Sequence, residues 1–527
     1  MSLQFITGNS GNGKTKYLFN RIVKEAKANP RDNYLVIVPE QFTMQTQRQL
    51  VDLSENKAIM NIDVLSFKRL AYRVFDELGI TNLTVLEETG KNLVLRKLAA
   101  QEADKLGVIG RNLNRIGYIS EVKSLLSELV QYNISPEELG RYIASGRLSD
   151  TLSDKLKDVL VLYEAFEKFM QDKYITAEEI LNVLSNVAEE SAILRNSVIA
   201  FDEFTGFTPI QNQLIKKLFV ISKKIYVTLT IDCREDIFKS RGMQELFDMP
   251  KRTVKSLTEM AAFYGIEVEE PIILDKNYRL AENEELSFME QQLFRKRRCS
   301  FKKVPKHIHI DCLRDPKQEL TKIARRINEL VRNENLRYRD IAIVTGDVNI
   351  YAGYVREIFD KYNIPYFIDA TQEILFHPFI EFIRSIPDIA AQHFSADAVF
   401  RFLRCGFSEL LDSEIDVLEN YVLACGVRGK SAWDKKWVRL PKHKAGYDLE
   451  LLNQSREYIM ELLKPVYQVF SDKKSTVKDY VLAIYKLIVL LDIPDKLAKK
   501  EQALLDAGDQ TASKEYGQIY KIVMQLF

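Results

Sequence analysis

The amino-acid sequence predicts an α/β protein with a parallel sheet that is interrupted by a long helical segment. Residues 1–40 show the pattern of a strand, a glycine-rich turn, a helix and a second strand. Further strand-like runs return at residues 197–201 and 224–231, after a stretch rich in Leu, Glu, Lys and Ala. Parallel strands need a crossover connection, usually a helix, so this order of elements favours an α/β fold.

The first elements follow from local patterns. Residues 3–7 form a β-type run, which the turn at residues 8–13 ends. Residues 14–28 carry apolar side chains at helical spacing. Residues 34–38 are continuously apolar, which is typical of a strand covered on both faces of a parallel sheet. Residues 3–38 are therefore predicted to form a βαβ unit.

The rest of the chain alternates between helical and mixed regions. A helical insertion is expected where glycine and proline are sparse, at residues 83–189. Beyond it, a second α/β region is expected with strands at 307–310, 340–345 and 364–368 and helices at 317–331 and 351–362. From Pro378 the pattern is helical again, and the apolar end of the chain suggests a longer polypeptide.

Composition and charge exclude several classes of protein. Apolar residues make up 46% and charged residues 28%, and the net charge is +1, which argues against a wholly basic nucleic-acid coat protein. No apolar run is long enough for a membrane span, and the first residues do not resemble a signal peptide. The five cysteines show no CxxC spacing, so neither a zinc site nor a disulfide framework is expected. Reduced cysteines predict a cytoplasmic location.

The strongest chemical signal is a complete GxxxxGK[ST] pattern near the start of the chain. Such a loop wraps its backbone amides around phosphate groups, and the following helix presents its positive end to them. Lys14 would reach the β- and γ-phosphates, and the Thr15 hydroxyl would bind Mg²⁺. The sequence therefore predicts that ATP and Mg²⁺ bind at Gly8, Asn9, Ser10, Gly11, Asn12, Gly13, Lys14 and Thr15.

A phosphate loop needs an acidic partner at the end of a neighbouring strand. Asp202 and Glu203 directly follow the apolar run 197–201. Asp202 would hold the metal ion, and Glu203 would activate the attacking water, with Lys14 as the third catalytic group. The alternative is an ordinary acidic loop after a strand. Further along, Tyr278 could stack on adenine, and Arg279 could neutralise charge on the γ-phosphate.

Two basic stretches are candidates for contacts with DNA. Cations that follow phosphates, next to aromatic rings that stack on bases, are typical of single-strand binding surfaces. The alternatives are a solvated linker for the first stretch and a loop with a core tryptophan for the second. The two stretches are residues 295–306 and 428–444. The candidate residues are Arg295, Lys296, Arg297 and Arg298 in the first stretch and Arg428, Lys430, Trp433 and Trp437 in the second.

In this order, the motifs resemble the superfamily 1 helicases of the UvrD/RecB type. The segment Leu274-Asp-Lys-Asn-Tyr-Arg279 is similar to their L-x-x-N-Y-R element. The resemblance implies two RecA-like P-loop domains with parallel sheets, each interrupted by a mostly helical insertion. The expected parts are residues 1–82 with 190–295, residues 83–189, residues 296–380 and an incomplete insertion at 381–527.

Three further segments are similar to the AddB family, the B subunits of bacterial AddAB (RexAB-type) ATP-dependent helicase–deoxyribonucleases. They are Val38-Pro-Glu-Gln-Phe-Thr43, Val64-Leu-Ser-Phe-Lys-Arg-Leu70 and Phe201-Asp-Glu-Phe-Thr-Gly-Phe-Thr-Pro209. This resemblance implies an AddA-like partner subunit, contacts with single-stranded DNA and double-stranded ends, and a role in resecting double-strand breaks. The family's nuclease domain and its 4Fe–4S cluster are expected only in the full-length protein.

The acidic motif at Asp202 and Glu203 departs from that of active motors of this class, in which Asp-Glu is followed by x-Gln-Asp. Here Asp202 and Glu203 are followed by Phe, Thr and Gly, so the Gln that links nucleotide state to DNA is missing. We therefore expect a degenerate motor and at most weak ATPase activity. The remaining alternatives are an unrelated P-loop NTPase or kinase, and a scaffold subunit with a vestigial nucleotide site.

Overall fold

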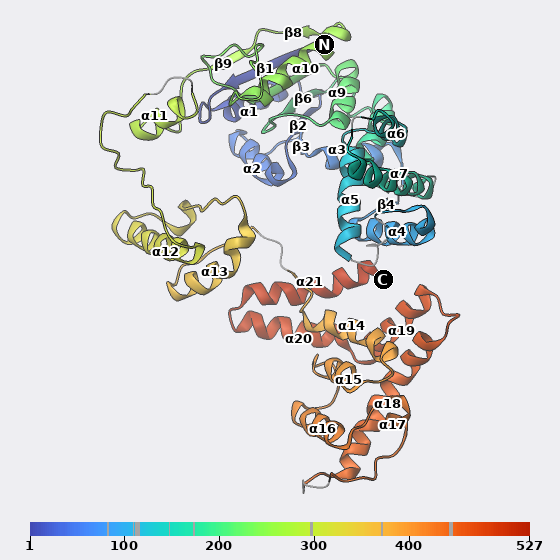
Figure 1. Ribbon diagram of the computed structural model, residues 1–527. Coiled ribbons are helices and arrows are strands. Elements are labelled where there is room, and N and C mark those ends of the chain that lie inside the picture. The colour runs from blue at the N-terminus through green and yellow to red at the C-terminus, as the bar shows by residue number, and fades with distance from the viewer. Residues whose placement is uncertain are drawn as a thin grey trace. The chain divides into compact units, whose positions relative to one another are not determined.

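The computed structural model describes residues 1–81, 84–108, 110, 116–146, 148–171, 174–295, 299–369, 373–441 and 446–527. The chain divides into two compact units, Met1–Asp311 (unit 1) and Cys312–Phe527 (unit 2), which are described separately (Figure 1).

Unit 1 is built on a seven-stranded sheet in which every described strand pair is parallel. The strand order is β3-β2-β6-β7-β1-β8, and β9 also pairs with β1. This sheet and the helices between its strands confirm the predicted α/β class. The strands are β1 (Ser2–Gly8), β2 (Tyr34–Ile37), β3 (Ile62–Leu65), β6 (Val198–Phe201), β7 (Lys224–Thr230), β8 (Glu267–Val268) and β9 (Ile272–Leu274).

Helices cover both faces of the sheet. Side chains alternate between the two faces along each strand, and because both sets are apolar, each face needs its own cover. Leu35 and Ile37 of β2 point into one core with α3, α8, α9 and α10, whereas Tyr34 and Val36 point into the other core with α1 and α2. These helices are α1 (Lys14–Ala28), α2 (Thr43–Leu53), α3 (Phe67–Leu78), α8 (Ile180–Val187), α9 (Pro209–Ile221) and α10 (Asp248–Phe263). The continuous apolar runs of the sequence are explained by this two-sided burial.

A helical segment lies between β3 and β6 in the sequence and has its own apolar core. Its helices are α4 (Glu88–Gln101), α5 (Ile116–Gln131), α6 (Pro136–Ala144) and α7 (Asp150–Met170). The chain enters and leaves this segment at a parallel two-stranded pair, β4 (Val85–Leu86) with β5 (Ile175–Thr176). The two ends of the insertion are therefore held together by the β4–β5 pair, and the insertion adds no strand to the main sheet.

Unit 2 is helical in its described residues. The helices α12 (Pro316–Asn333) and α13 (Val348–Lys361) pack on a small core of their own. A larger core joins the helices that follow, α14 (Pro378–Ala391), α15 (Ala396–Leu403), α16 (Asp412–Cys425), α17 (Lys430–Asp434), α18 (Leu449–Ser471), α19 (Val477–Leu490), α20 (Ile493–Asp506) and α21 (Gln510–Leu526). One more helix, α11 (Glu284–Gln292), belongs to unit 1.

The strands predicted at 307–310, 340–345 and 364–368 are not formed, since none of these segments has a strand partner among the described residues. A strand is held by hydrogen bonds to a neighbour, so an apolar run without one is only extended chain. Ile310, Val344 and Phe367 are accordingly 94%, 92% and 88% exposed. The helices predicted around them are present as α12 and α13.

The tryptophans of unit 2 are core residues, so their predicted role in stacking on DNA bases is wrong. Trp433 is 0% and Trp437 7% exposed, and their rings lie 5.3 Å apart. The Trp437 indole N–H donates to the Ala432 carbonyl, and Arg456 of α18 donates to the Trp433 carbonyl. The loop therefore folds its aromatic side chains inward against α18.

No helix in the described part of the chain combines the length and the apolar character that crossing a bilayer requires.

The burial of Trp433 predicts a stability effect. Trp433→Ala should lower the free energy of unfolding of unit 2 by ~3–5 kcal/mol, because it leaves a large cavity in the core. The chain has 2 tryptophans, so Trp437 remains as the fluorescent reporter during urea unfolding. Val438→Ala at a 79% exposed position is the control and should change the unfolding free energy by less than ~0.5 kcal/mol. Equal effects of the two substitutions would contradict the core assignment.

Candidate nucleotide-binding site

The phosphate loop, residues 8–13, connects the end of β1 to the first turn of α1. Gly13 caps α1, and its carbonyl accepts the first helical hydrogen bond, from the Tyr17 amide at 2.8 Å. Lys14 reaches back across the loop and donates from Nζ to the Asn9 carbonyl at 3.0 Å. Burial lowers the pKa of Lys14, although Glu203 and Asp202 attract its charge. The loop therefore brings one cation and a helix N-terminus to the same place, as binding of a phosphate group requires.

The register of the sheet brings the acidic pair to this loop. Phe201 of β6 lies opposite Val227 of β7, which places Asp202 beside Thr228. On its other side β7 pairs with β1, so that Gly8 lies opposite Thr230. All three strands run in the same direction, and their carboxyl ends therefore meet at one edge. The acidic pair predicted from the sequence lies at this edge.

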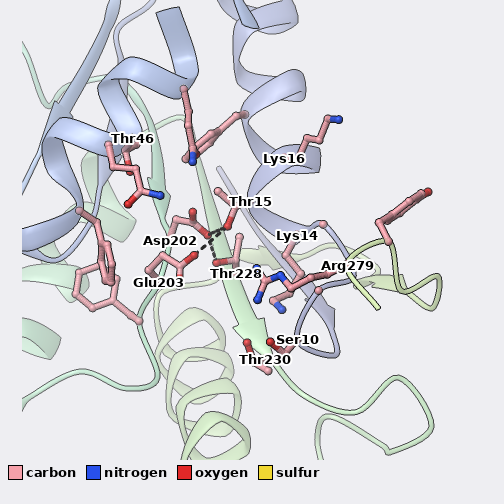
Figure 2. A pocket seen from close by; sticks show the side chains of 18 of the residues that line it. Ser10, Lys14, Thr15, Lys16, Thr46, Asp202, Glu203, Thr228, Thr230 and Arg279 are labelled. Atoms are coloured by element: carbon pink, nitrogen blue, oxygen red, sulfur yellow. Dashed lines mark hydrogen bonds between the residues drawn. The ribbon is translucent and has the colours of Figure 1, made fainter. Parts of the chain in front are cut away.

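The hydroxyl of Thr15 joins the loop to both carboxylates (Figure 2). It lies 3.3 Å from Asp202 Oδ1 and 3.2 Å from Glu203 Oε1. Glu203 has a positive φ of 64°, a conformation that costs energy for a residue with a side chain. The chain thus turns sharply at the end of β6 and presents the two carboxylates to Thr15.

Asp202 is 1% exposed, and burial raises its pKa to about 6. The Thr228 hydroxyl donates to its Oδ1 and stabilises the charged form, whereas the negative charge of Glu203 opposes it. The second oxygen, Oδ2, is buried and has no hydrogen-bond partner among the described residues. A buried carboxylate in this state favours a cation as its neighbour.

These residues fit a magnesium ion. Mg²⁺ prefers oxygen ligands and in nucleotide sites is held by one or two carboxylates together with phosphate oxygens. The Thr15 hydroxyl and the Asp202 Oδ2 atom are such oxygens. A bound Mg²⁺ would supply positive charge between them and a triphosphate.

Most of the predicted nucleotide residues line one cavity of about 730 Å³. The phosphate loop, Lys14 and Thr15 form one wall, and Tyr278 and Arg279 arrive from the segment after β9. Asn9 and Asn12 are buried, and neither they nor Gly8 are among the lining residues. The structure thus brings most of the predicted site together, although the side chains of Asn9 and Asn12 serve the loop itself.

Sequence reasoning missed two contributions to the cavity. Thr228 bonds to Asp202, and α2 adds a polar wall that includes Gln45, Thr46 and Gln49. A signal for the second was present, because these polar residues follow the strand at residues 34–38 and so lie at the carboxyl edge of the sheet.

A family model described as "ADDB, N-terminal" matches residues 5–290. The chain belongs to the AddB family. It is 38% identical over its full length to the B subunit of the ATP-dependent helicase/deoxyribonuclease of Lachnoclostridium phytofermentans, of which the match covers 47%. Proteins of the same name from Clostridium novyi and Clostridioides difficile are 31% and 32% identical, with 46% of each covered. The chain therefore spans about half the length of these curated relatives.

In this AddB-family chain, Arg295 does not serve as the DNA contact predicted from the sequence. Its guanidinium donates to Asp232 Oδ2 at 2.9 Å, lies over the Phe247 ring, and is 12% exposed. Arg234 pairs with the same carboxylate, and these partners hold the pKa of Asp232 far below its usual value despite its burial. Arg295 is therefore a structural ion-pair residue, and the predicted contacts at Lys296, Arg297 and Arg298 lie outside the described residues.

The second basic stretch is only partly available for DNA. Arg428 is exposed, whereas Lys430 pairs with Asp434 and lies over the Tyr467 ring. Exposed cations also occur nearby at Lys435, Lys436 and Arg439. DNA contact in this AddB-family chain therefore remains a prediction for these cations, without the two tryptophans.

The raised pKa of Asp202 predicts a pH-dependent gain in stability for Asp202→Asn. The carboxyl pKa is about 6 in the folded state and 3.8 for an aspartate in an unstructured peptide, so ionisation of Asp202 destabilises the fold. The stabilising effect of the neutral form is full below pH 4 and is lost as the pH rises through about 6. Asp202→Asn should therefore raise the unfolding free energy at pH 8 by up to ~3 kcal/mol, and little at pH 4.

Unfolding in urea at the two pH values measures this difference. Glu203→Gln removes the same charge from an exposed neighbour, so at pH 8 it should raise stability by less than Asp202→Asn, because burial contributes more than Glu203 to the raised pKa of Asp202. A loss of stability in Asp202→Asn at pH 8 would contradict the assignment of Asp202 as a carboxylate whose charged form is disfavoured by burial.

Proposed function

We propose that this chain is the ATP-binding, single-stranded-DNA-handling part of a heterodimeric helicase–nuclease that resects DNA double-strand breaks for recombinational repair. The observation that carries the proposal is the contact of Thr15 with Asp202 and Glu203 at the mouth of a phosphate loop. The names of the relatives support the rest: they are B subunits of ATP-dependent helicase/deoxyribonucleases, which points to an AddA-like partner.

ATP hydrolysis by this chain is proposed to be slow or absent. Thr205 stands at the position of the Gln of the related motors, and the ring of Phe204 before it packs at 5.2 Å from Phe207 and 5.6 Å from Phe67. The Thr205 hydroxyl lies on a shorter side chain than the amide of Gln and carries one donor hydrogen where the amide carries two, so it does not replace that amide. Membership of the AddB family argues against an unrelated kinase. The intact set of Lys14, Thr15 and Asp202 supports retained nucleotide binding over a vestigial site.

DNA handling by unit 2 is proposed to use a cationic patch, defined as Arg428, Lys435, Lys436 and Arg439. These side chains are exposed and flank α17 in the sequence, close to the two buried tryptophans along the chain. Cations of this kind contact the phosphate backbone, which supports binding without a preference for sequence.

Replacing Lys14 tests the nucleotide site. Lys14→Ala should weaken binding of ATP–Mg²⁺ by about 10- to 100-fold, because a charge-assisted hydrogen bond to phosphate is lost. Isothermal titration calorimetry measures the affinity, and ATPase assays with and without single-stranded DNA measure turnover. Lys24→Ala, on an exposed position of the same helix, is the matched control and should bind ATP normally. Unchanged ATP binding in Lys14→Ala would refute the proposed site.

Replacing three cations of the patch tests DNA handling. The variant with Arg428, Lys435 and Lys436 all changed to Ala should bind single-stranded oligonucleotides more weakly. Its plot of log affinity against log salt should be shallower by about 2, because each phosphate contact contributes about 0.7. Fluorescence anisotropy with oligo-dT at several salt concentrations measures both quantities.

The control removes the same charge elsewhere in unit 2, by changing the exposed Lys473, Lys474 and Lys478 to Ala. If the two triple variants lose affinity equally, the patch is not the contact surface.

A further inference from the structure

The segment after β9, residues 275–279, forms a brace against the phosphate loop. The backbone amides of Tyr278 and Arg279 both donate to the Gly11 carbonyl, at 3.0 and 3.3 Å. The side chain of Asn277 donates from Nδ2 to the Ser10 carbonyl at 3.0 Å. Two consecutive carbonyls of the loop are thus occupied by donors from the brace.

Asn277 uses both ends of its amide. While Nδ2 binds the loop, Oδ1 accepts the Leu280 amide at 2.9 Å and so fixes the turn that carries Tyr278 and Arg279. Tyr278 and Arg279 line the nucleotide cavity. A single side chain therefore connects the loop that would hold phosphates to the two residues that would hold the base and the γ-phosphate.

The glycines of the loop show how closely the brace approaches. The GxxxxGK[ST] pattern leaves position 11 free, yet Gly11 occupies it with φ of +88°. A Cβ atom there would lie 2.8 Å from both Arg279 Cβ and Asn277 Oδ1, and one at Gly8 would lie 2.5 Å from the Leu274 carbonyl oxygen. Packing against the brace thus requires glycine at a position that phosphate binding alone leaves open.

Other contacts hold the loop independently of Asn277. The Asn9 side chain donates to Glu290 Oε1 at 3.0 Å and accepts the Cys233 amide at 2.9 Å. Asn12 donates to the Leu274 carbonyl at 2.5 Å. Loss of the Asn277 side chain should therefore leave the loop folded but free to shift relative to Tyr278 and Arg279.

We propose that Asn277 is a positioning residue that holds the phosphate loop and the Tyr278–Arg279 pair as one rigid unit, so that the site distinguishes ATP from ADP. The proposal rests on the proposed nucleotide-binding function. A loop carbonyl that turned toward a phosphate would repel it, and the donor from Asn277 keeps the Ser10 carbonyl engaged on the brace side. Arg279 can then meet only a ligand that carries a γ-phosphate.

The test compares the affinities of ATP and ADP for the 527-residue chain by calorimetry. Asn277→Ala should weaken ATP about 5- to 10-fold, the effect of one lost hydrogen bond, and ADP less than about twofold. Asn277→Asp keeps an acceptor for Leu280 but removes the donor to Ser10, so it should lose ATP affinity to a similar extent. In an Arg279→Ala background, Asn277→Ala should add little, because the two residues act together.

The matched structural control is Asn61→Ala. Asn61 also donates to backbone carbonyls, those of Ala26, Asn29 and Asp32, but it precedes β3 at the opposite edge of the sheet. Its loss should lower the melting temperature and leave the ratio of ATP to ADP affinity unchanged.

If Asn277→Ala binds ATP normally and the ratio of ATP to ADP affinity is unchanged, the inference is wrong but the proposed nucleotide site stands. The same holds if the affinities for ATP and ADP fall equally and in step with the melting temperature. If the unsubstituted chain binds neither nucleotide, the proposed function fails, and the inference fails with it.

Discussion

The parallel direction of β6, β7 and β1 is the constraint on which the candidate site depends. Thr15 and Asp202 are 187 residues apart in the sequence, and their side chains meet only because these strands end at the same edge. If β6 ran antiparallel to β1, the acidic pair would lie at the far edge, away from the phosphate loop. The long helical insertion leaves this arrangement intact, since the chain enters and leaves it at the β4–β5 pair.

Local sequence patterns were sufficient to predict the phosphate loop and four of the seven strands of the main sheet. The runs at residues 3–7, 34–38, 197–201 and 224–231 correspond to β1, β2, β6 and β7 with small shifts at their ends. These strands are buried on both faces, so their apolar character is continuous and easily recognised. The acidic pair was predicted for a similar reason, because residues that follow a parallel strand lie at its carboxyl edge.

The failed predictions concern features that distant contacts decide. Basic residues around Trp433 look the same in the sequence whether the ring faces solvent or the core. Arg295 is neutralised by Asp232, which lies 63 residues away. The apolar run at 340–345 has the composition of a strand, but it has no strand partner among the described residues. The composition of a segment shows that it could form a strand or bind DNA. Whether it does so depends on the residues that the fold places next to it.

Phe204 and the brace together indicate how a change at the nucleotide site would reach the rest of the unit. The position after Glu203, near which related motors carry a polar coupling residue, holds a ring in a cluster with Phe67, Phe201 and Phe207. Such a cluster packs the end of β6 but has no hydrogen bond to exchange with a nucleotide.

The brace has the opposite character, because it meets the phosphate loop through three hydrogen bonds and continues within a few residues into α11. From α11, Glu290 returns to the loop through Asn9, which closes a ring of polar contacts around residues 8–13. A displacement of the loop would therefore be carried by the brace and α11, and the acidic strand would stay fixed by its aromatic packing.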